Sequence, residues 1–178
     1  MRILYRARQF WHTVFLKTDP HSFRLVQEQL TPAQWALFNQ LQPDEQAHAI
    51  SIYRKLLHQG DHHPDLLAAA LLHDIGKLRY RMNSIERAWI VLAQAILPGK
   101  AKRWGSLPRD GWEGLPGWRK AFILAEHHAE WGAQLARQAG VSPLAEALIR
   151  GHQHPQQPEA GDLENNLLSK LRAADNDS

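Results

Sequence analysis

The dipeptide His73-Asp74 is the first place where this chain could do chemistry. It follows Leu-Leu-Ala-Ala-Ala-Leu-Leu at residues 66–72, a run of strong helix formers, so both polar side chains come at the end of a buried helix. Near a helix end, adjacent side chains can reach one point, and a neutral imidazole with a carboxylate makes a metal site of borderline-hard ligands. The alternative is a buried histidine with satisfied hydrogen bonds and an aspartate in a turn.

Lys77 completes the motif LLHDIGK. Gly76 favours a helix end, so we predict a helix over residues 65–75 that carries the dipeptide near its carboxyl terminus. Lys77 could contact a phosphate group of a substrate, or it could pair with a carboxylate of the same site. For Arg79 and Arg81, a solvated helix face is the more ordinary interpretation than contact with phosphate.

Four other side chains of ligand type belong to helices that the apolar periodicity predicts. His48 falls beside the apolar face of a predicted helix over residues 43–59. This helix and the next are joined by a turn, so they can pack antiparallel with His48 and His73 at the same end. The remaining three are His128 within a helix over 118–139, His152 at the end of a helix from Pro143, and Asp175 after a helix over 162–174.

Other histidines compete for these roles. His127 adjoins His128, so that choice stays open, and His154 is a weaker candidate than His152 because it stands against Pro155. Three more histidines occupy a predicted helix end or the turn after it, where surface positions are usual: His58, His62 and His63.

The order of these residues resembles that of the HD-domain metal-dependent phosphohydrolases. LLHDIGK looks like the signature of that family, whose pattern has an earlier histidine, further histidines after the signature and a distant aspartate. His128, followed after three residues by Gly132-Ala133, is similar to a later family histidine. Asp175, which follows alanine in LRAADND, resembles the closing aspartate. The resemblance covers about residues 40–178.

The helical periodicities, with almost no alternating strand pattern, predict a single all-α domain of about seven helices over residues 1–178, and the resemblance implies that it is an HD-domain-like helical bundle. Residues 1–30 are then an N-terminal helical extension, which includes an amphipathic helix over 2–17 and a connector over 18–24. Residues 98–118, rich in Gly, Pro and Trp, are a loop insertion, either a lid over the site or a surface excursion pinned by its tryptophans. Thr31 with Gln34 predicts a capping box, and Ser84 predicts the cap of a helix over 85–97.

The resemblance also implies a ligand set: His48, His73, Asp74, His128, His152 and Asp175. One or two divalent ions would bind there, with iron or manganese favoured by the mixture of imidazole and carboxylate, and magnesium possible. Asp74 would be a ligand, would bridge two ions and would orient the water that the metal activates. Asp74 and Lys77 are accordingly the expected catalytic residues.

The expected function is hydrolysis of a phosphoester or phosphoanhydride in a small, nucleotide-like substrate. The class that hydrolyses cyclic dinucleotides carries Gly-Tyr-Pro after its histidines, whereas this chain reads HHAEWGAQL, so that class is not supported. Two alternatives stay open. One is a non-catalytic sensor of the same fold that binds metal or nucleotide. The other is a structural helical module, such as an oxygen-using di-iron protein.

Composition fits a soluble globular domain. The 178 residues carry a net charge of +3, and hydrophobic residues make up 44% of the chain. The basic residues form no stripe, so no nucleic acid is expected as partner. The N-terminus lacks the pattern of a secretory signal, no apolar run is long enough for a membrane span, and cysteine is absent. We therefore expect a cytoplasmic protein, and the oligomeric state stays open.

Overall fold

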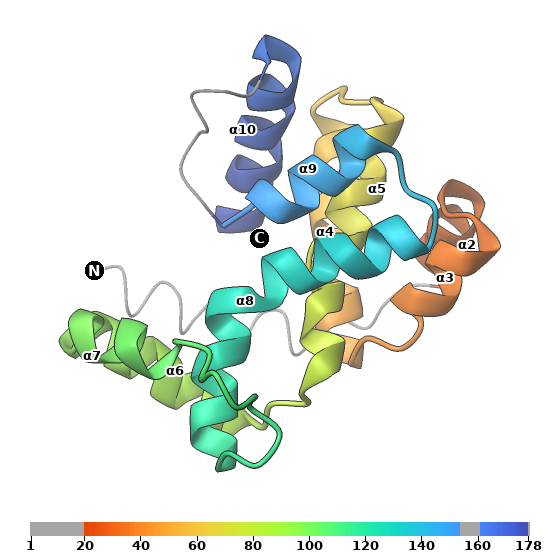
Figure 1. The fold of residues 1–178 in the computed structure, drawn as a ribbon. Coiled ribbons are helices and arrows are strands. Elements are labelled where there is room, and N and C mark those ends of the chain that lie inside the picture. The colour runs from red at the N-terminus through yellow and green to blue at the C-terminus, as the bar shows by residue number, and fades with distance from the viewer. Residues whose placement is uncertain (1–19, 154–160, 178) are drawn as a thin grey trace.

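The computed structural model describes residues 20–153 and 161–177. Within these ranges the secondary structure is helical and contains no strand, which confirms the all-α prediction for this part of the chain (Figure 1). The predicted helix over 2–17 and His154 lie outside the described residues. The helices are α2 (Pro20–Gln29), α3 (Pro32–Phe38), α4 (Pro43–His58), α5 (Pro64–Leu72), the 3₁₀ helix η1 (Ile75–Arg79), α6 (Ser84–Ile96), α7 (Pro98–Trp104), α8 (Gly117–Gln138), α9 (Pro143–Gly151) and α10 (Asp162–Asn176).

Three boundaries differ from the prediction. The predicted connector over 18–24 gives way to α2, which begins at Pro20. The predicted loop over 98–118 begins with helix α7, because Pro98 is suited to a first helical turn; only residues 105–116 lack regular helix. The cap of α6 is Asn83 rather than Ser84: the Asn83 Oδ1 atom accepts a hydrogen bond of 2.9 Å from the amide of Glu86.

The capping box before α3 is confirmed. The Thr31 hydroxyl accepts from the amide of Gln34 at 3.4 Å, and the Gln34 side chain accepts from the amide of Thr31 at 3.1 Å. This reciprocal pair satisfies two amides that the first helical turn leaves free. Proline begins α3, α4, α5 and α9. It also favours a helix start, because an amide in the first turn has no partner within the helix and proline has no amide hydrogen.

Gly76 does not end a helix as predicted. Helix α5 ends at Leu72, and the chain continues through His73 and Asp74 into η1. Gly76 lies inside η1, where a Cβ atom would stand 1.9 Å from the carbonyl oxygen of His128 and 2.7 Å from the amide nitrogen of Gly132. Glycine is required there because η1 and α8 pack backbone to backbone.

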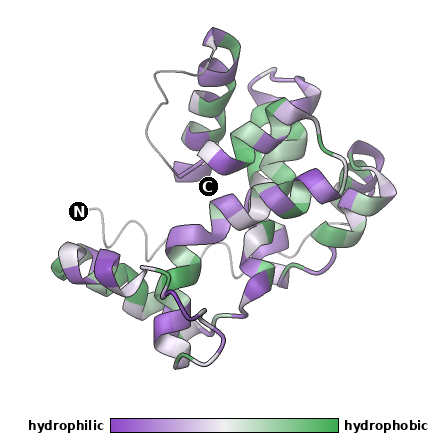
Figure 2. Cartoon of the chain, viewed as in Figure 1, coloured by the Kyte–Doolittle hydropathy of each residue, from purple (hydrophilic) through white to green (hydrophobic). Residues whose placement is uncertain are grey.

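Two hydrophobic cores support the site. The larger joins α4, α5, α9 and α10, and the smaller joins α6, α7 and the first half of α8. Hydrophobic residues gather on α5, which packs against α4, α9 and α10 (Figure 2). Helix α8 passes from one core to the other, with Leu124 in the smaller and Ala133 in the larger, so His128 lies between them. No described helix is long and apolar enough to span a membrane.

Candidate metal centre

Three of the predicted ligands have their imidazole rings fixed by backbone carbonyls. Nδ1 of His73 lies 3.0 Å from the oxygen of Ala70, Nδ1 of His128 lies 3.1 Å from that of Leu124, and Nδ1 of His152 lies 2.7 Å from that of Ile149. A carbonyl can only accept, so each Nδ1 carries the proton and donates. This leaves Nε2 as the atom available to a metal, as in known histidine-metal sites.

The carboxylate of Asp74 lies between two of these rings. Its Oδ2 atom is 3.4 Å from Nε2 of His73, and its Oδ1 atom is 3.2 Å from Nε2 of His128. Both oxygens of one buried carboxylate thus face imidazole nitrogens from different helices. Such a carboxylate could bind one ion or bridge two.

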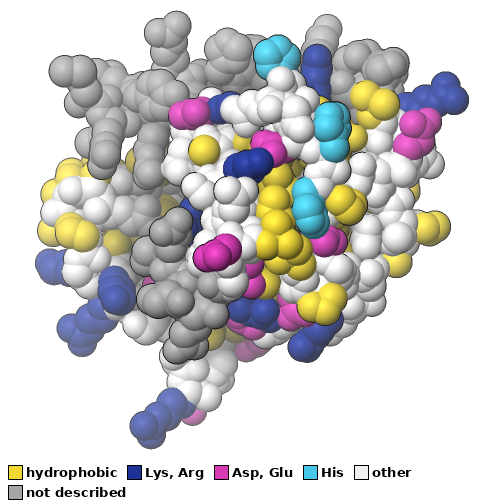
Figure 3. Space-filling view, turned by 90° about the horizontal axis from the view of Figure 1, so that it is seen from above, with side chains coloured by type: hydrophobic (Ala, Val, Ile, Leu, Met, Phe, Trp, Pro, Cys, Tyr) yellow, Lys and Arg dark blue, Asp and Glu magenta, His cyan; other side chains and the backbone are white. Residues whose placement is uncertain are grey.

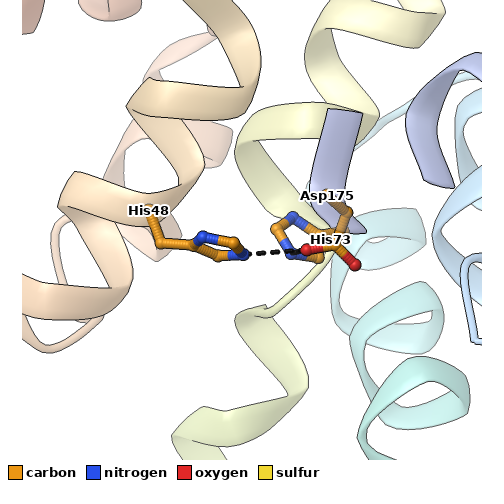
Figure 4. A group of neighbouring side chains, drawn as sticks. All are labelled: His48, His73 and Asp175. Carbon is orange, nitrogen blue, oxygen red and sulfur yellow. Dashed lines mark hydrogen bonds and ion pairs between the residues drawn. The ribbon is translucent and has the colours of Figure 1, made fainter. Parts of the chain in front are cut away.

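The carboxylate of Asp175 lies between His48 and His73. Its Oδ1 atom lies 2.9 Å from Nε2 of His48 and 4.0 Å from Nε2 of His73. Figure 4 shows these three side chains pointing toward one another from α4, from the end of α5 and from α10. The antiparallel packing of α4 and α5 that the spacing predicted therefore does bring His48 and His73 to the same end.

Two overlapping groups have the spacing of metal ligands. Candidate ligand atoms of His48, His73 and Asp175 lie within 4.8 Å of one another, and so do those of His73, Asp74 and His152. The ring of His152 lies 5.0 Å from that of His73 and 5.3 Å from that of His128. The structure therefore brings together all six predicted metal ligands, with His73 common to both groups.

In α8, His128 rather than His127 faces the candidate metal centre. His128 is buried against Asp74, whereas Nε2 of His127 lies 3.1 Å from the carbonyl oxygen of Gly105 and its ring lies beside Trp131. His58 and His62 are exposed, as expected for surface residues. His63 is half-buried at the start of α5, with Nδ1 3.9 Å from Asp65.

Lys77 pairs with Asp74. Its Nζ atom donates to Oδ2 of Asp74 at 2.6 Å, and the lysine side chain is 23% exposed against 5% for the aspartate. Lys77 therefore links the buried carboxylate to the surface. Of the two possibilities that the sequence left open, the carboxylate pair is the one observed. Contact with a phosphate stays a prediction.

Charge pairing decides the ionisation of both carboxylates. Burial alone would raise the pKa of Asp74, but the charges of Lys77 and His73, with the hydrogen bond to His128, hold it well below its usual value. Burial likewise opposes ionisation of Asp175, yet its hydrogen bond with His48 and the charge of His73 lower its pKa to about 2. Both groups are therefore carboxylates at neutral pH and can serve as ligands.

The pKa values of two buried histidines shift in opposite directions. Burial lowers the pKa of His73, but the charge of Asp74 and the hydrogen bond to it outweigh burial and raise that pKa to about 9. Burial lowers the pKa of His152, and the neighbouring His73 and His128 lower it further, to about 3. At neutral pH the metal-free site thus holds His73 as imidazolium and His152 as neutral imidazole.

The donor set fits a divalent transition metal. Imidazole nitrogen with carboxylate oxygen suits iron, manganese or zinc better than magnesium, which prefers oxygen alone. The rings of His73, His128 and His152 are held by second hydrogen bonds before any ion arrives, which lowers the entropy that binding must overcome. These carbonyl contacts were not foreseen from the sequence, although each acceptor lies one helical turn before its histidine.

A pocket opens beside Lys77. Its volume is about 340 Å³, near the lower end for small-molecule sites, and its lining includes Glu45, Lys77 and Arg81. The guanidinium of Arg81 is oriented by a 3.1 Å hydrogen bond to the side chain of Gln42. Glu45 is buried and pairs with Arg87 at 3.0 Å. Neither Glu45 nor Arg87 was singled out from the sequence.

Known proteins offer no match to this arrangement: no family model, no curated protein and no solved structure matches the chain. What the site can do must therefore follow from its own geometry.

Proposed function

We propose that this chain is a metal-dependent phosphohydrolase of the HD-domain type, acting on a phosphoester or phosphoanhydride of a small, nucleotide-like substrate. The observation that carries the proposal is the convergence of four histidines and two aspartates, drawn from five separate segments, around the buried carboxylate of Asp74. A cluster of core histidines would need no such mixture of aligned Nε2 atoms and ionised carboxylates.

The metal in this proposal is iron or manganese, in one or two ions. When bound, such an ion lowers the pKa of a water ligand and polarises a phosphoryl oxygen. The chain supplies the rest: Asp74 orients the water, and the neutral His152 completes the donor set. We favour two ions because six candidate ligands exceed what one ion with open water positions needs, and because the two oxygens of Asp74 face different histidines and could bridge two ions.

Substrate binding is proposed at the pocket beside Lys77. Lys77 and Arg81 give its lining two cations that can approach the oxygens of a phosphate group. Its volume suits a small phosphorylated molecule rather than a polymer. We also propose that the protein acts in the cytoplasm.

The direct test is metal-supported hydrolysis of phosphoesters and nucleoside phosphates by the purified chain. Asp74→Ala should abolish activity while helical circular dichroism is retained. An exposed position on the same molecule, His58→Ala, serves as the control and should leave activity unchanged. If the wild-type chain hydrolyses no phosphoester with any divalent metal, the proposal is wrong.

A second candidate is a non-catalytic binding module of the same fold. The 2.6 Å pair between Lys77 and Asp74 favours it, because a carboxylate oxygen paired with lysine is less available to bridge two ions and to orient a water. Tight binding of metal or nucleotide without turnover would distinguish this module from the enzyme.

A further inference from the structure

Helix α6 carries more apolar surface than the core covers. Its buried residues, Ile90 and Ala93, belong to the smaller core. A second apolar stripe follows the spacing i, i+4, i+7, i+11, which places its members on one face of the helix. These side chains are exposed: Ile85 at 82%, Trp89 at 42%, Leu92 at 45% and Ile96 at 64%.

This stripe is a continuous surface rather than scattered single residues. Its four members occupy successive turns of α6, so they adjoin one another along the helix. Contiguous exposed apolar surface of this kind marks a binding site, because isolated apolar residues are common on proteins but aligned ones are not. Helices α6 and α7 lie at one edge of the molecule, away from α10, so the stripe is accessible to a large partner (Figure 1).

Positive charge lies on and just after the neighbouring helix α7, which packs against α6. Residues 97–109 contain no acidic residue, and their cations are Lys100, Lys102, Arg103 and Arg109. All four are exposed, and none forms an ion pair with another residue in the described ranges. Figure 3 shows Lys and Arg side chains beside hydrophobic ones at the left edge, where Figure 1 has α6 and α7.

The positive charge near the stripe favours an anionic partner over the other groups that could cover this surface. Residues 1–19 carry Arg2, Arg6, Arg8 and Lys17 against Asp19 alone, so docking them here would bring like charges together. A second copy of the chain would also bring its own α7 cations to the contact. An anionic partner relieves this repulsion, and an apolar stripe flanked by cations is the pattern of helices that lie in a lipid surface.

We propose that α6 and α7 bind the surface of an anionic phospholipid bilayer. The apolar stripe of α6 would enter the boundary between headgroups and acyl chains, with Trp89 at the headgroup level, where indole rings are favoured. The cations of residues 100–109 would lie against anionic headgroups. None of these residues belongs to the metal centre, so membrane binding and hydrolysis can fail independently.

Because the chain has no cysteine, a single introduced thiol gives a clean probe. Leu92→Cys, labelled with a polarity-sensitive fluorophore in the full chain, should shift to shorter wavelength with vesicles of equimolar phosphatidylcholine and phosphatidylglycerol, and not with phosphatidylcholine alone. Leu163→Cys is the matched control, since Leu163 is 56% exposed on α10. No shift at position 92, or equal shifts at both positions, would overturn the proposal.

Vesicle flotation tests the two halves of the surface separately. Leu92→Glu, and independently Lys102→Glu, should each weaken binding of the chain to the anionic vesicles by at least about tenfold, because one places a charge in the lipid boundary and the other reverses a contact with headgroups. Both positions are exposed, so circular dichroism should be unchanged. Unchanged flotation in both variants would show that another part of the chain binds the vesicles, and it would overturn the proposal. So would a dimer that Leu92→Glu dissociates, without binding to vesicles.

Discussion

Gly76 lies directly against the backbone of His128, so close that a Cβ atom on Gly76 would stand 1.9 Å from the His128 carbonyl oxygen. This contact fixes η1 against α8 and so determines how Asp74, two residues before Gly76, meets the ring of His128. The geometry of the site thus depends on a backbone contact as much as on the ligands.

The first prediction concerns this contact. Gly76→Ala should destabilise the fold by at least about 1–3 kcal/mol, the usual range for overpacking, because backbone atoms must move apart. It should also weaken metal binding, since Asp74 and His128 separate. Thermal unfolding and metal content measure the two effects. Gly99→Ala is the control: its Cβ would meet nothing within 4 Å, so stability should be unchanged or slightly raised.

The second prediction distinguishes two adjacent histidines. His128→Ala should lower metal affinity by more than about tenfold, as loss of a ligand or of its orienting partner does. His127→Ala should not, because its ring faces Gly105 rather than Asp74. Metal titration of both purified variants provides the measurement. Equal losses in the two variants, or a loss only in His127→Ala, would contradict the assignment.

The third prediction concerns acid stability of the metal-free chain. The pKa of His152 is about 3 in the fold and about 6.5 when unfolded, so the unfolded state binds the extra proton. Stability is therefore present above pH 6.5 and falls as the pH decreases toward 3, by up to ~1.4 kcal/mol per pH unit. Denaturant unfolding in the presence of a chelator should show this slope, and His152→Gln should flatten it. An unchanged slope in His152→Gln would contradict the prediction.

The fourth prediction concerns alkaline stability and has the opposite sign. The pKa of His73 is raised from 6.5 to about 9, so its charged form contributes stability fully below pH 6.5 and loses it as the pH rises through 9. A metal ion needs neutral imidazole, so metal binding near pH 7 should release about one proton from His73. Calorimetry in buffers of different ionisation enthalpy measures that release. Binding without proton release would contradict the protonated state.

The fifth prediction concerns Lys77. Lys77→Met should lower kcat/KM for the phosphorylated substrate by roughly tenfold to a hundredfold, the effect of losing a charged hydrogen bond. If Lys77 serves only as partner of Asp74, the variant should instead leave kcat/KM unchanged or raise metal affinity. Lys55→Met is the matched control, since Lys55 pairs with Asp177 at 3.0 Å, outside the candidate site.

The six candidate ligands could be named from the sequence because their order along the chain resembles a family pattern, and because each is a polar residue on or beside an otherwise apolar helix. The resemblance favoured His128 over His127, but the physical reason could not be predicted, since both occupy one helix and only the close packing of η1 against α8 decides which ring faces Asp74. The pairing of Glu45 with Arg87 joins segments distant in sequence, so no local pattern indicated it.

Helix α7 was missed for a different reason. Its residues, PGKAKRW, contain Pro and Gly, which usually mark a loop. Pro98 nevertheless suits the first turn, and Ala101 packs into the smaller core, so tertiary contact stabilises a helix that local propensity disfavours. For α6 the helix itself was predicted, but which of its apolar residues are buried depends on its packing against α7 and α8.

Anomalous diffraction at the absorption edge of iron or manganese, from crystals grown with that metal, tests the central claim most directly. We predict strong density within bonding distance of His48, His73, Asp74 and Asp175, with a second peak toward His128 and His152 if two ions bind. An ordered crystal in which these side chains surround no metal peak at saturating iron or manganese would contradict the account.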